Sequence, residues 1–170
     1  MSLELRDLDY SDLDLVYDWY NGPALYETLV GEYTPRTREE AREYMRAHWI
    51  GGETTVRKII VADGQPVGLI ALSNIDRSEA VAAIDIFIAD KAARGRGYGR
   101  RALTQMLDAG FNALGLKRIY LDLLEDNTAA RRIYEHCGFA PRGGVQGTAI
   151  KGGVTKNIIR MTLDKRDWRP

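Results

Sequence analysis

The sequence predicts an α/β (α+β) fold in which a mixed central sheet of about seven strands carries helices on both faces. Strand-like and helix-like segments follow one another in the order β-α-α-β-β-β-α-β-α-β-β. Helical connections allow parallel neighbours, whereas short turns give antiparallel ones, so the sheet should be mixed. The 170 residues, 45% of them hydrophobic, are enough to bury one core, and we expect a single domain over residues 1–170.

The first third of the chain predicts one strand and two helices. Leu3 to Leu8 alternates apolar and polar residues, as in a half-buried strand. Ser11 is expected to cap a helix that the Asn-Gly-Pro sequence at 21–23 ends. Thr37 and Glu40 have the spacing of a capping box, which predicts that a second helix starts there.

The rest of the chain predicts six strands and two further helices. Segments 56–62 and 67–74 flank a turn and read as a hairpin, and Glu79 to Ile88 reads as a third strand. A glycine-rich turn then opens the longest helix. The nearly continuous apolar run from Arg118 to Leu124 indicates a strand buried on both faces. A helix from Asn127 or Thr128 and strands around 139–148 and 157–163 complete the order.

Composition excludes several classes of protein. The 24 Lys and Arg residues balance 24 Asp and Glu residues, which argues against a global grip on nucleic acid or an acidic membrane. Apolar runs stay well below the roughly 18 residues of a membrane span, and the charged N-terminus lacks a secretion signal. One cysteine and two histidines make a metal site unexpected, and we expect a cytoplasmic protein.

The turn from Arg94 to Arg101 combines three glycines with four arginines at the start of a helix. Free N–H groups and the helix dipole make a helix N-terminus an anion site. Arginines would be unfavourable beside that dipole unless an anion were also present, so the turn predicts a phosphate ligand rather than a solvated basic loop. The Walker pattern is absent. Gly97, Gly99 and Ala102 match a dinucleotide fingerprint weakly, which leaves a nicotinamide or flavin enzyme as an alternative.

The chain resembles the GNAT N-acetyltransferase superfamily over essentially its whole length. Arg94-x-x-Gly97-x-Gly99 is similar to the family's pyrophosphate loop, R/Q-x-x-G-x-G/A. About thirty residues further on, the stretch from Glu125 through Asn127 and Tyr134 to Gly138-Phe139 is similar to its C-terminal motif. The start and the end of the chain resemble the ribosomal-protein and spermidine N-acetyltransferase branches.

The resemblance implies an enzyme that transfers acetyl from acetyl-CoA to a primary amine by direct attack in a ternary complex. Its backbone donor for the thioester carbonyl would lie near Phe87 to Ala89, at the splayed end of the fourth strand. The residues that the resemblance assigns to cofactor binding are Phe87, Ile88, Ala89, Arg94, Gly95, Arg96, Gly97, Tyr98, Gly99, Arg100, Asn127, Ala130 and Tyr134.

Tyr134 is the expected general acid, because a phenol with a pKa of about 10 can donate to a thiolate whose own pKa is near 8.5. Asn127 lies two helical turns earlier, on the same face. The general base is expected to be a carboxylate on the fourth strand, Asp85 or Glu79, with Glu125 as a further candidate. For Tyr134 and Asp85, simple core packing or a solvent-facing strand position are the alternatives.

The acceptor is expected between the first two helices and the last strand pair, roughly at 26–36 and 145–155. Glu27 and Glu32 could hold a cationic amine there, and Tyr26 and Tyr33 could form its walls. Acidic residues are frequent in this half of the chain, which favours a cationic acceptor, either a small-molecule amine or a protein N-terminus. Cys137 is expected to pack in the core. A non-catalytic CoA-binding module and a homodimer are both compatible with the sequence.

Overall fold

The computed structural model describes residues 1–170, the side chain of Ala24 excepted. Seven strands form one sheet in the order β1-β2-β3-β4-β5-β7-β6. The strands are β1 (Leu3–Asp7), β2 (Val56–Ala62), β3 (Gln65–Asp76), β4 (Val81–Ile88), β5 (Arg118–Leu124), β6 (Ala140–Lys151) and β7 (Val154–Asp164). The helices are α1 (Leu13–Tyr20), α2 (Pro23–Tyr26), α3 (Arg38–His48), α4 (Tyr98–Asp108) and α5 (Thr128–His136). This architecture confirms the predicted mixed sheet and adds the short helix α2.

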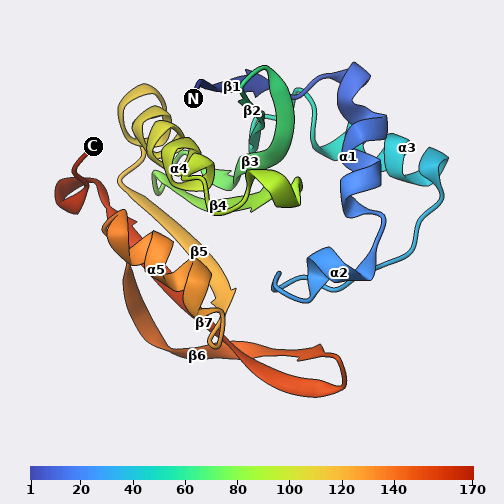
Figure 1. The fold of residues 1–170 in the computed structure, drawn as a ribbon. Coiled ribbons are helices and arrows are strands. Elements are labelled where there is room, and N and C mark those ends of the chain that lie inside the picture. The colour runs from blue at the N-terminus through green and yellow to red at the C-terminus, as the bar shows by residue number, and fades with distance from the viewer.

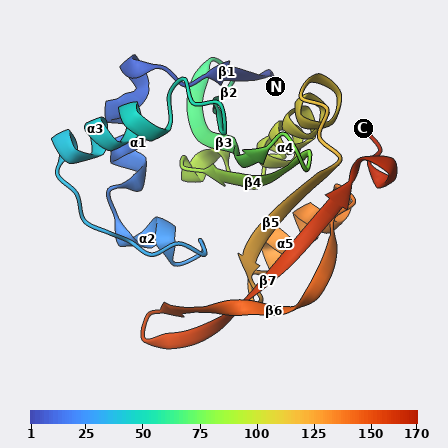
Figure 2. The ribbon, with the colours of Figure 1, turned by 180° about the vertical axis from the view of Figure 1, so that it is seen from behind.

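The two faces of the sheet are covered by different helices because side chains alternate along each strand. Ile70, Leu72 and Ile84 turn to one face and pack with the apolar side of α4. Leu69 and Ala71 turn to the other face and pack with α1 and α3. Figures 1 and 2 show α1 and α3 on the opposite side of the molecule from α4 and α5. The sheet therefore separates two regions that only an opening between strands can connect.

Such an opening exists between β4 and β5. These two strands run parallel and pair only from Val81–Ala83 to Arg118–Tyr120. Beyond this point they diverge, as the ribbon shows (Figure 1), while each strand continues for several residues. The remaining neighbours in the sheet are antiparallel. The predicted splay of the fourth strand is thus confirmed.

Capping residues in the sequence predicted the start of α3 correctly, but the predicted cap of α1 is wrong. Thr37 and Glu40 form the predicted capping box of α3. Ser11 does not cap α1: the carboxylate of Asp9 accepts the Ser11 N–H at 2.6 Å, and a single 3₁₀ turn precedes the helix. Asp9 is the stronger acceptor because its side chain carries a charge.

The strand from Arg118 to Leu124 is fully buried on one face but only partly on the other, which corrects the prediction. Asp122 is exposed and binds Arg160 of β7 through two hydrogen bonds of 2.8 Å. Ile119, Leu121 and Leu123 on the opposite face pack in the core with residues of α4 and α5. The last two strands form a hairpin longer than expected, which turns at Gly152 and Gly153 with positive φ angles of 58° and 77°. None of the helices among the described residues has the length and apolar character needed to cross a bilayer.

Candidate active site

Two glycines of the glycine-rich loop have backbone angles in the left-handed region. Gly95 and Gly97 have φ angles of 72° and 81°, which side chains rarely tolerate. Gly97 is the N-cap residue of α4 and has no side chain that could cap the helix. The first intrahelical bond runs from the N–H of Arg101 to the carbonyl of Gly97 at 3.1 Å. The N–H groups of Tyr98, Gly99 and Arg100, which come before Arg101 in α4, have no acceptor within the helix. They can therefore bind an anion.

The arginines of the loop are held in different ways. Arg94 donates through Nε to the carbonyl oxygen of Ile88 at 2.9 Å, which ties the loop to the end of β4. Arg96 lies over the ring of Tyr98, with Cζ 5.4 Å from the centroid. Arg100 meets Nε2 of His136 at 3.0 Å. Because a guanidinium only donates, this nitrogen of His136 must accept. Arg96 and Arg100 therefore stay near the helix start, whereas Arg94 also braces the loop.

Tyr98 is built into the core. Its side chain is 1% exposed, and its phenol donates to Oδ2 of Asp63 at 2.5 Å. The side chain predicted to contact the cofactor therefore points away from the helix start. What Tyr98 can offer a ligand is its backbone N–H at the first position of α4.

The chain is irregular directly after β4. The N–H groups of Ala89 and Asp90 both donate to the carbonyl of Val67, at 2.8 and 3.2 Å, so two residues oppose one. Along a strand, the backbone N–H groups of successive residues point in turn to one neighbouring strand and then to the other. Phe87, two residues before Ala89, therefore also turns its N–H to β3. Ile88 turns its N–H toward the diverging β5. Among Phe87, Ile88 and Ala89, only Ile88 therefore has a backbone donor directed into the opening.

Gly68 allows β3 to approach β4 closely at this point. A Cβ atom on Gly68 would lie 2.2 Å from the carbonyl oxygen of Phe87, a distance that no side chain can occupy. Only glycine fits opposite Ile88 in this register. The sequence analysis did not single out Gly68, because its requirement comes from the facing strand.

Tyr134 and Asp85 lie close enough to influence each other electrostatically. Burial raises the pKa of the Tyr134 phenol above its ordinary value, and the negative charge of Asp85 raises it further. The Tyr134 ring packs against Phe139, with centroids 5.9 Å apart. Tyr134 is on α5 and Asp85 is on β4, so this electrostatic influence links two elements that are far apart in the sequence.

Asp85 sits among polar and aromatic groups on the α1 and α3 side of the sheet. Its carboxylate accepts from the hydroxyl of Ser73 at 3.2 Å. Desolvation raises the pKa of Asp85, while Ser73 and the positive charge of Arg57 oppose that effect. Many protein atoms lie around the Asp85 side chain, which explains its desolvation. The side chain is nevertheless exposed, so solvent still reaches it. A carboxylate of raised pKa in this position can take up a proton.

The other predicted polar residues have structural partners. Asn127 accepts the N–H of Ala130 at 3.2 Å, as the N-cap of α5, and its amide donates to the carbonyl of Thr28 at 3.4 Å. The Asn127 side chain therefore closes the start of α5 and holds the loop after α2. Glu125 accepts from the amide of Asn157 at 2.8 Å. Glu79 precedes β4, at the opposite end of the strand from Ile88, so it is excluded as a base near the opening.

A cavity of about 560 Å³ lies between α4, α5 and the C-terminal residues. Arg100, Arg101 and Thr104 line it from α4, and His136 and Cys137 line it from α5. Burial raises the pKa of Cys137, so its thiol stays protonated, as expected for a residue without a nucleophilic role. Thr104, Arg169 and this cavity were not predicted from the sequence. The arginines at the start of α4 were the one sequence feature that indicated an anion site nearby.

A second cavity, of about 180 Å³, lies in the predicted acceptor region. Tyr26 and Tyr33 line it, as expected, together with aromatic residues of α1 and α3. Glu27 and Glu32 are exposed and do not belong to the residues that line it. Lys151 donates to the carbonyl of Gly31 at 2.5 Å, which joins the β6–β7 hairpin to the loop after α2. The two segments predicted to enclose the acceptor are thus in contact.

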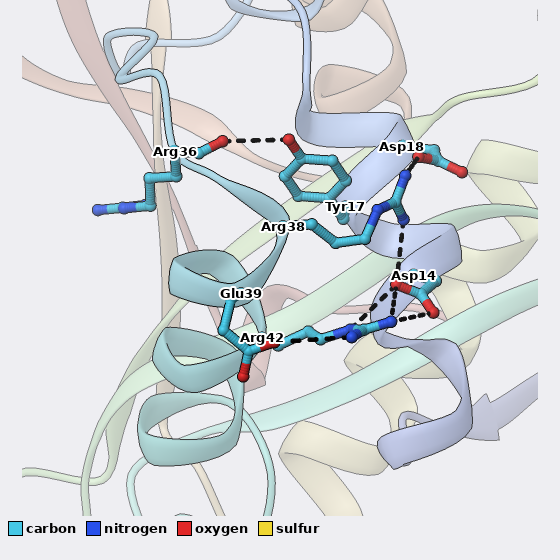
Figure 3. Close-up of polar contacts among 7 residues, drawn as sticks. All are labelled: Asp14, Tyr17, Asp18, Arg36, Arg38, Glu39 and Arg42. Carbon is cyan, nitrogen blue, oxygen red and sulfur yellow. Dashed lines mark hydrogen bonds and ion pairs between the residues drawn. The ribbon is translucent and has the colours of Figure 1, made fainter.

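An ion-pair cluster joins α1 to α3 beside this cavity (Figure 3). Asp14 accepts from Arg38 at 3.0 Å and from Arg42 at 2.6 Å, and Asp18 accepts from Arg38 at 2.8 Å. Tyr17 donates to the carbonyl of Arg36 at 3.1 Å. These arginines pair with Asp14 and Asp18, so part of the acidic charge in this half of the chain is neutralised by ion pairs within the protein.

Comparison with known proteins agrees with this geometry. A family model described as "Acetyltransferase (GNAT) domain" matches residues 2–140. The chain therefore belongs to the GNAT acetyltransferase family, and it is an acetyltransferase that uses acetyl-CoA. The helix start, the glycine loop and the arginines fit the anionic part of such a substrate. The family assignment also decides against a dinucleotide-dependent enzyme. The described residues contain no group of three or more His, Cys, Asp or Glu side chains placed to hold a metal.

Individual relatives act on different amines. The chain is 28% identical to the spermidine N(1)-acetyltransferase of Escherichia coli K12, over 98% of this chain and 88% of that protein. It is 27% identical to the aminoglycoside N(6')-acetyltransferase type 1 of Klebsiella pneumoniae, over 95% and 87% of the two chains. The spermidine N-acetyltransferase of Vibrio cholerae, solved with CoA and spermine, superimposes with a TM-score of 0.89 at 26% identity, covering 97% and 96%. A dodecameric structure of that enzyme matches with a TM-score of 0.82 at 25% identity, covering 96% and 94%.

Proposed function

We propose that this chain, acting as a single N-acetyltransferase domain, transfers the acetyl group directly to a primary amine in a ternary complex. The observation that carries this proposal is the opening between β4 and β5, with an anion-binding helix start on α4. The negative charge of Asp85 on β4 acts on the buried phenol of Tyr134 on α5. One residue can donate a proton there, and the other can accept one. Direct transfer requires both groups on opposite sides of one reacting carbonyl.

The glycine loop and the start of α4 hold the pyrophosphate of acetyl-CoA in this proposal. The N–H groups of Tyr98, Gly99 and Arg100 supply donors, and Arg96 and Arg100 supply positive charge. The N–H of Ile88 faces the opening and donates to the thioester carbonyl, where negative charge develops. The N–H of Ala130 donates a hydrogen bond to the side-chain oxygen of Asn127. These two residues therefore support the cofactor site by fixing the start of α5, not by binding the cofactor with free polar groups.

Tyr134 donates a proton or a hydrogen bond to the leaving thiolate. Its raised pKa keeps the phenol protonated before transfer. Burial disfavours a phenolate and a thiolate alike, so the apolar surroundings do not themselves oppose transfer between the two groups. Asp85 accepts the proton of the attacking ammonium, directly or through water. Its raised pKa improves its match to an amine near neutral pH.

The acceptor amine enters from the side of α1, α2 and the β6–β7 hairpin. Contact between Lys151 and Gly31 encloses this side of the opening. Assembly of several copies is consistent with the dodecameric structure of the Vibrio cholerae enzyme, and we propose that this chain also forms oligomers.

The test measures thiol release from acetyl-CoA with a panel of primary amines. Tyr134→Phe should lower turnover by well over tenfold and leave acetyl-CoA affinity nearly unchanged, since the phenol acts on the leaving group. Tyr120→Phe serves as a matched control on β5 and should retain full activity. Unchanged turnover in Tyr134→Phe would refute the role of the phenol. Binding of acetyl-CoA by the wild type without any turnover would favour a non-catalytic CoA-binding module.

A further inference from the structure

The cavity in the acceptor region is walled mainly by aromatic rings. Six of them line it: Tyr17, Tyr20, Tyr26, Tyr33, Tyr44 and Trp49. Met45 and Ala41 of α3 add apolar surface. Its volume of about 180 Å³ is close to the roughly 150 Å³ of an apolar cavity known to bind benzene. The space therefore suits one ring or a branched aliphatic group of similar size.

Guanidinium groups of this chain already cover several of the rings. Arg36 lies over Tyr44, and Arg57 lies over Trp49, each with Cζ 4.5 Å from the centroid. Arg38 covers Tyr17 at the same distance. Among the described residues that line the cavity there is no carboxylate, whereas Arg36 is one of them. A guest with several ammonium groups would therefore meet the positive charge of Arg36 at the cavity wall, and no carboxylate among the lining residues would balance the additional charges.

Tyr20 links the wall of the cavity to the proposed reaction centre. The ring of Tyr20 contacts that of Phe87, with centroids 5.0 Å apart, near the end of β4. Asp85 lies close enough to Tyr20 for its charge to raise the pKa of that phenol. The carboxylate of Asp85 thus stands near the Tyr20 side of the cavity wall. One ammonium group at Asp85 would place its substituent toward the aromatic rings.

We infer that the acceptor is a primary amine with one positive charge and one ring-sized apolar group, and that it is not a polyamine. The inference rests on the proposed acetyl transfer to an amine and names the substrate class of that site. The apolar group occupies the aromatic cavity, and the amine reaches toward Asp85. The aromatic side chain of a peptide's first residue offers the same chemistry as a free arylalkylamine.

The first experiment compares substrates. Acetylation rates are measured for 2-phenylethylamine, butylamine, spermidine and a tripeptide that begins with phenylalanine. We expect 2-phenylethylamine to exceed spermidine and butylamine in kcat/KM by about tenfold or more, as filling an apolar pocket does. The tripeptide shows whether the ring arrives on a peptide N-terminus. Preference for spermidine would overturn the inference and leave the acetyltransferase function intact.

The second experiment fills the cavity. Ala41→Phe places a ring into the cavity from α3, and Ala47→Phe adds the same ring at an exposed position of the same helix. Ala41→Phe should raise KM for 2-phenylethylamine by about tenfold without changing KM for acetyl-CoA, and Ala47→Phe should change neither. Equal effects of the two variants would contradict the inference.

The third experiment reverses charge and includes a readout that does not need turnover. Arg36→Glu gives the cavity a carboxylate and should shift preference toward spermidine, whereas Arg46→Glu, which is exposed on α3, should not. Calorimetry measures 2-phenylethylamine binding to the wild type and to Ala41→Phe in the presence of CoA. Binding by the wild type alone supports the inference even if no amine is acetylated. No binding by the wild type overturns it.

Discussion

The phenol of Tyr98 donates a 2.5 Å hydrogen bond to Asp63, a residue 35 positions earlier in the chain. This bond joins the first turn of α4 to the turn between β2 and β3. Asp63 also accepts the N–H of Ser2 at 2.7 Å, so the N-terminus is part of the same link. The buried side chain of Tyr98 therefore anchors the loop proposed to hold pyrophosphate, without itself contacting the ligand.

Tyr98→Phe removes this anchor and keeps the buried ring. We expect KM for acetyl-CoA to rise by up to about tenfold while kcat changes little, because the loop loses order but keeps its binding groups. Steady-state kinetics at saturating amine checks this. A fall in kcat with an unchanged KM would show that Tyr98 acts on the chemical step instead.

Asp85→Asn keeps the shape of the side chain and removes the proposed base. We expect kcat to fall by about a hundredfold, within the usual range for general base catalysis. In the wild type, kcat/KM should decline as pH falls through the pKa of Asp85, which lies above the ordinary aspartate value. The variant should lack this decline. A pH profile with the same acid limb in both proteins would assign the base elsewhere.

The same substitution should stabilise the protein near neutral pH. Because folding raises the pKa of Asp85, the folded state favours the protonated carboxyl, and ionisation opposes folding as pH rises through the folded pKa. Asp85→Asn removes this opposition, so its Tm should exceed that of the wild type at pH 7. The difference should vanish below the ordinary pKa of 3.8, where the wild-type carboxyl is protonated in both states. Melting curves at several pH values measure it.

The contribution of Asp12 to stability should depend on pH in the opposite way to that of Asp85. It is 5% exposed and accepts hydrogen bonds of 2.7 and 2.8 Å from Arg6, which lower its pKa. Its contribution is present above the ordinary pKa of 3.8 and is lost as pH falls through the lower folded value. Asp12→Asn should cost roughly 1–3 kcal/mol at pH 7, because Arg6 keeps a partly solvated guanidinium.

Urea unfolding at pH 7 and near pH 3 checks this prediction. The loss from Asp12→Asn should shrink at the lower pH. Asp18→Asn breaks an exposed ion pair with Arg38 and provides the control, with an expected cost of about 1 kcal/mol or less. Similar losses for both variants would show that burial of the Arg6–Asp12 pair adds nothing.

Gly68→Ala tests the close approach of β3 to β4. Its Cβ would collide with the Phe87 carbonyl at 2.2 Å, so the strands must separate. We expect a loss of about 2–4 kcal/mol and weaker acetyl transfer, because the end of β4 moves. Gly31→Ala meets nothing within 4 Å and should be nearly neutral. Denaturant unfolding of both variants measures the difference, and an unaffected Gly68→Ala would show that the strands yield without cost.

Local features of the fold could be predicted because they depend on neighbours in sequence. The capping box of Thr37 and Glu40 and the helix that starts at the glycine turn are examples. The site was predictable where one short motif contains it, as in the glycine loop. The exclusion of Glu79 and the capping role of Asn127 were not, because they depend on strand position and on a partner far along the chain.

The sequence by itself determined the order of elements, the anion-binding helix start and the family. These follow from periodicity, glycine placement and two motifs, all of which are local patterns. Only the tertiary structure decided that the charge of Asp85 acts on Tyr134, that arginines pair with Asp14 and Asp18, and that aromatic rings wall the acceptor cavity. The reason is physical: contacts between distant residues depend on where β4 and β5 separate and on how α1 and α3 pack, and neither is encoded in any short segment.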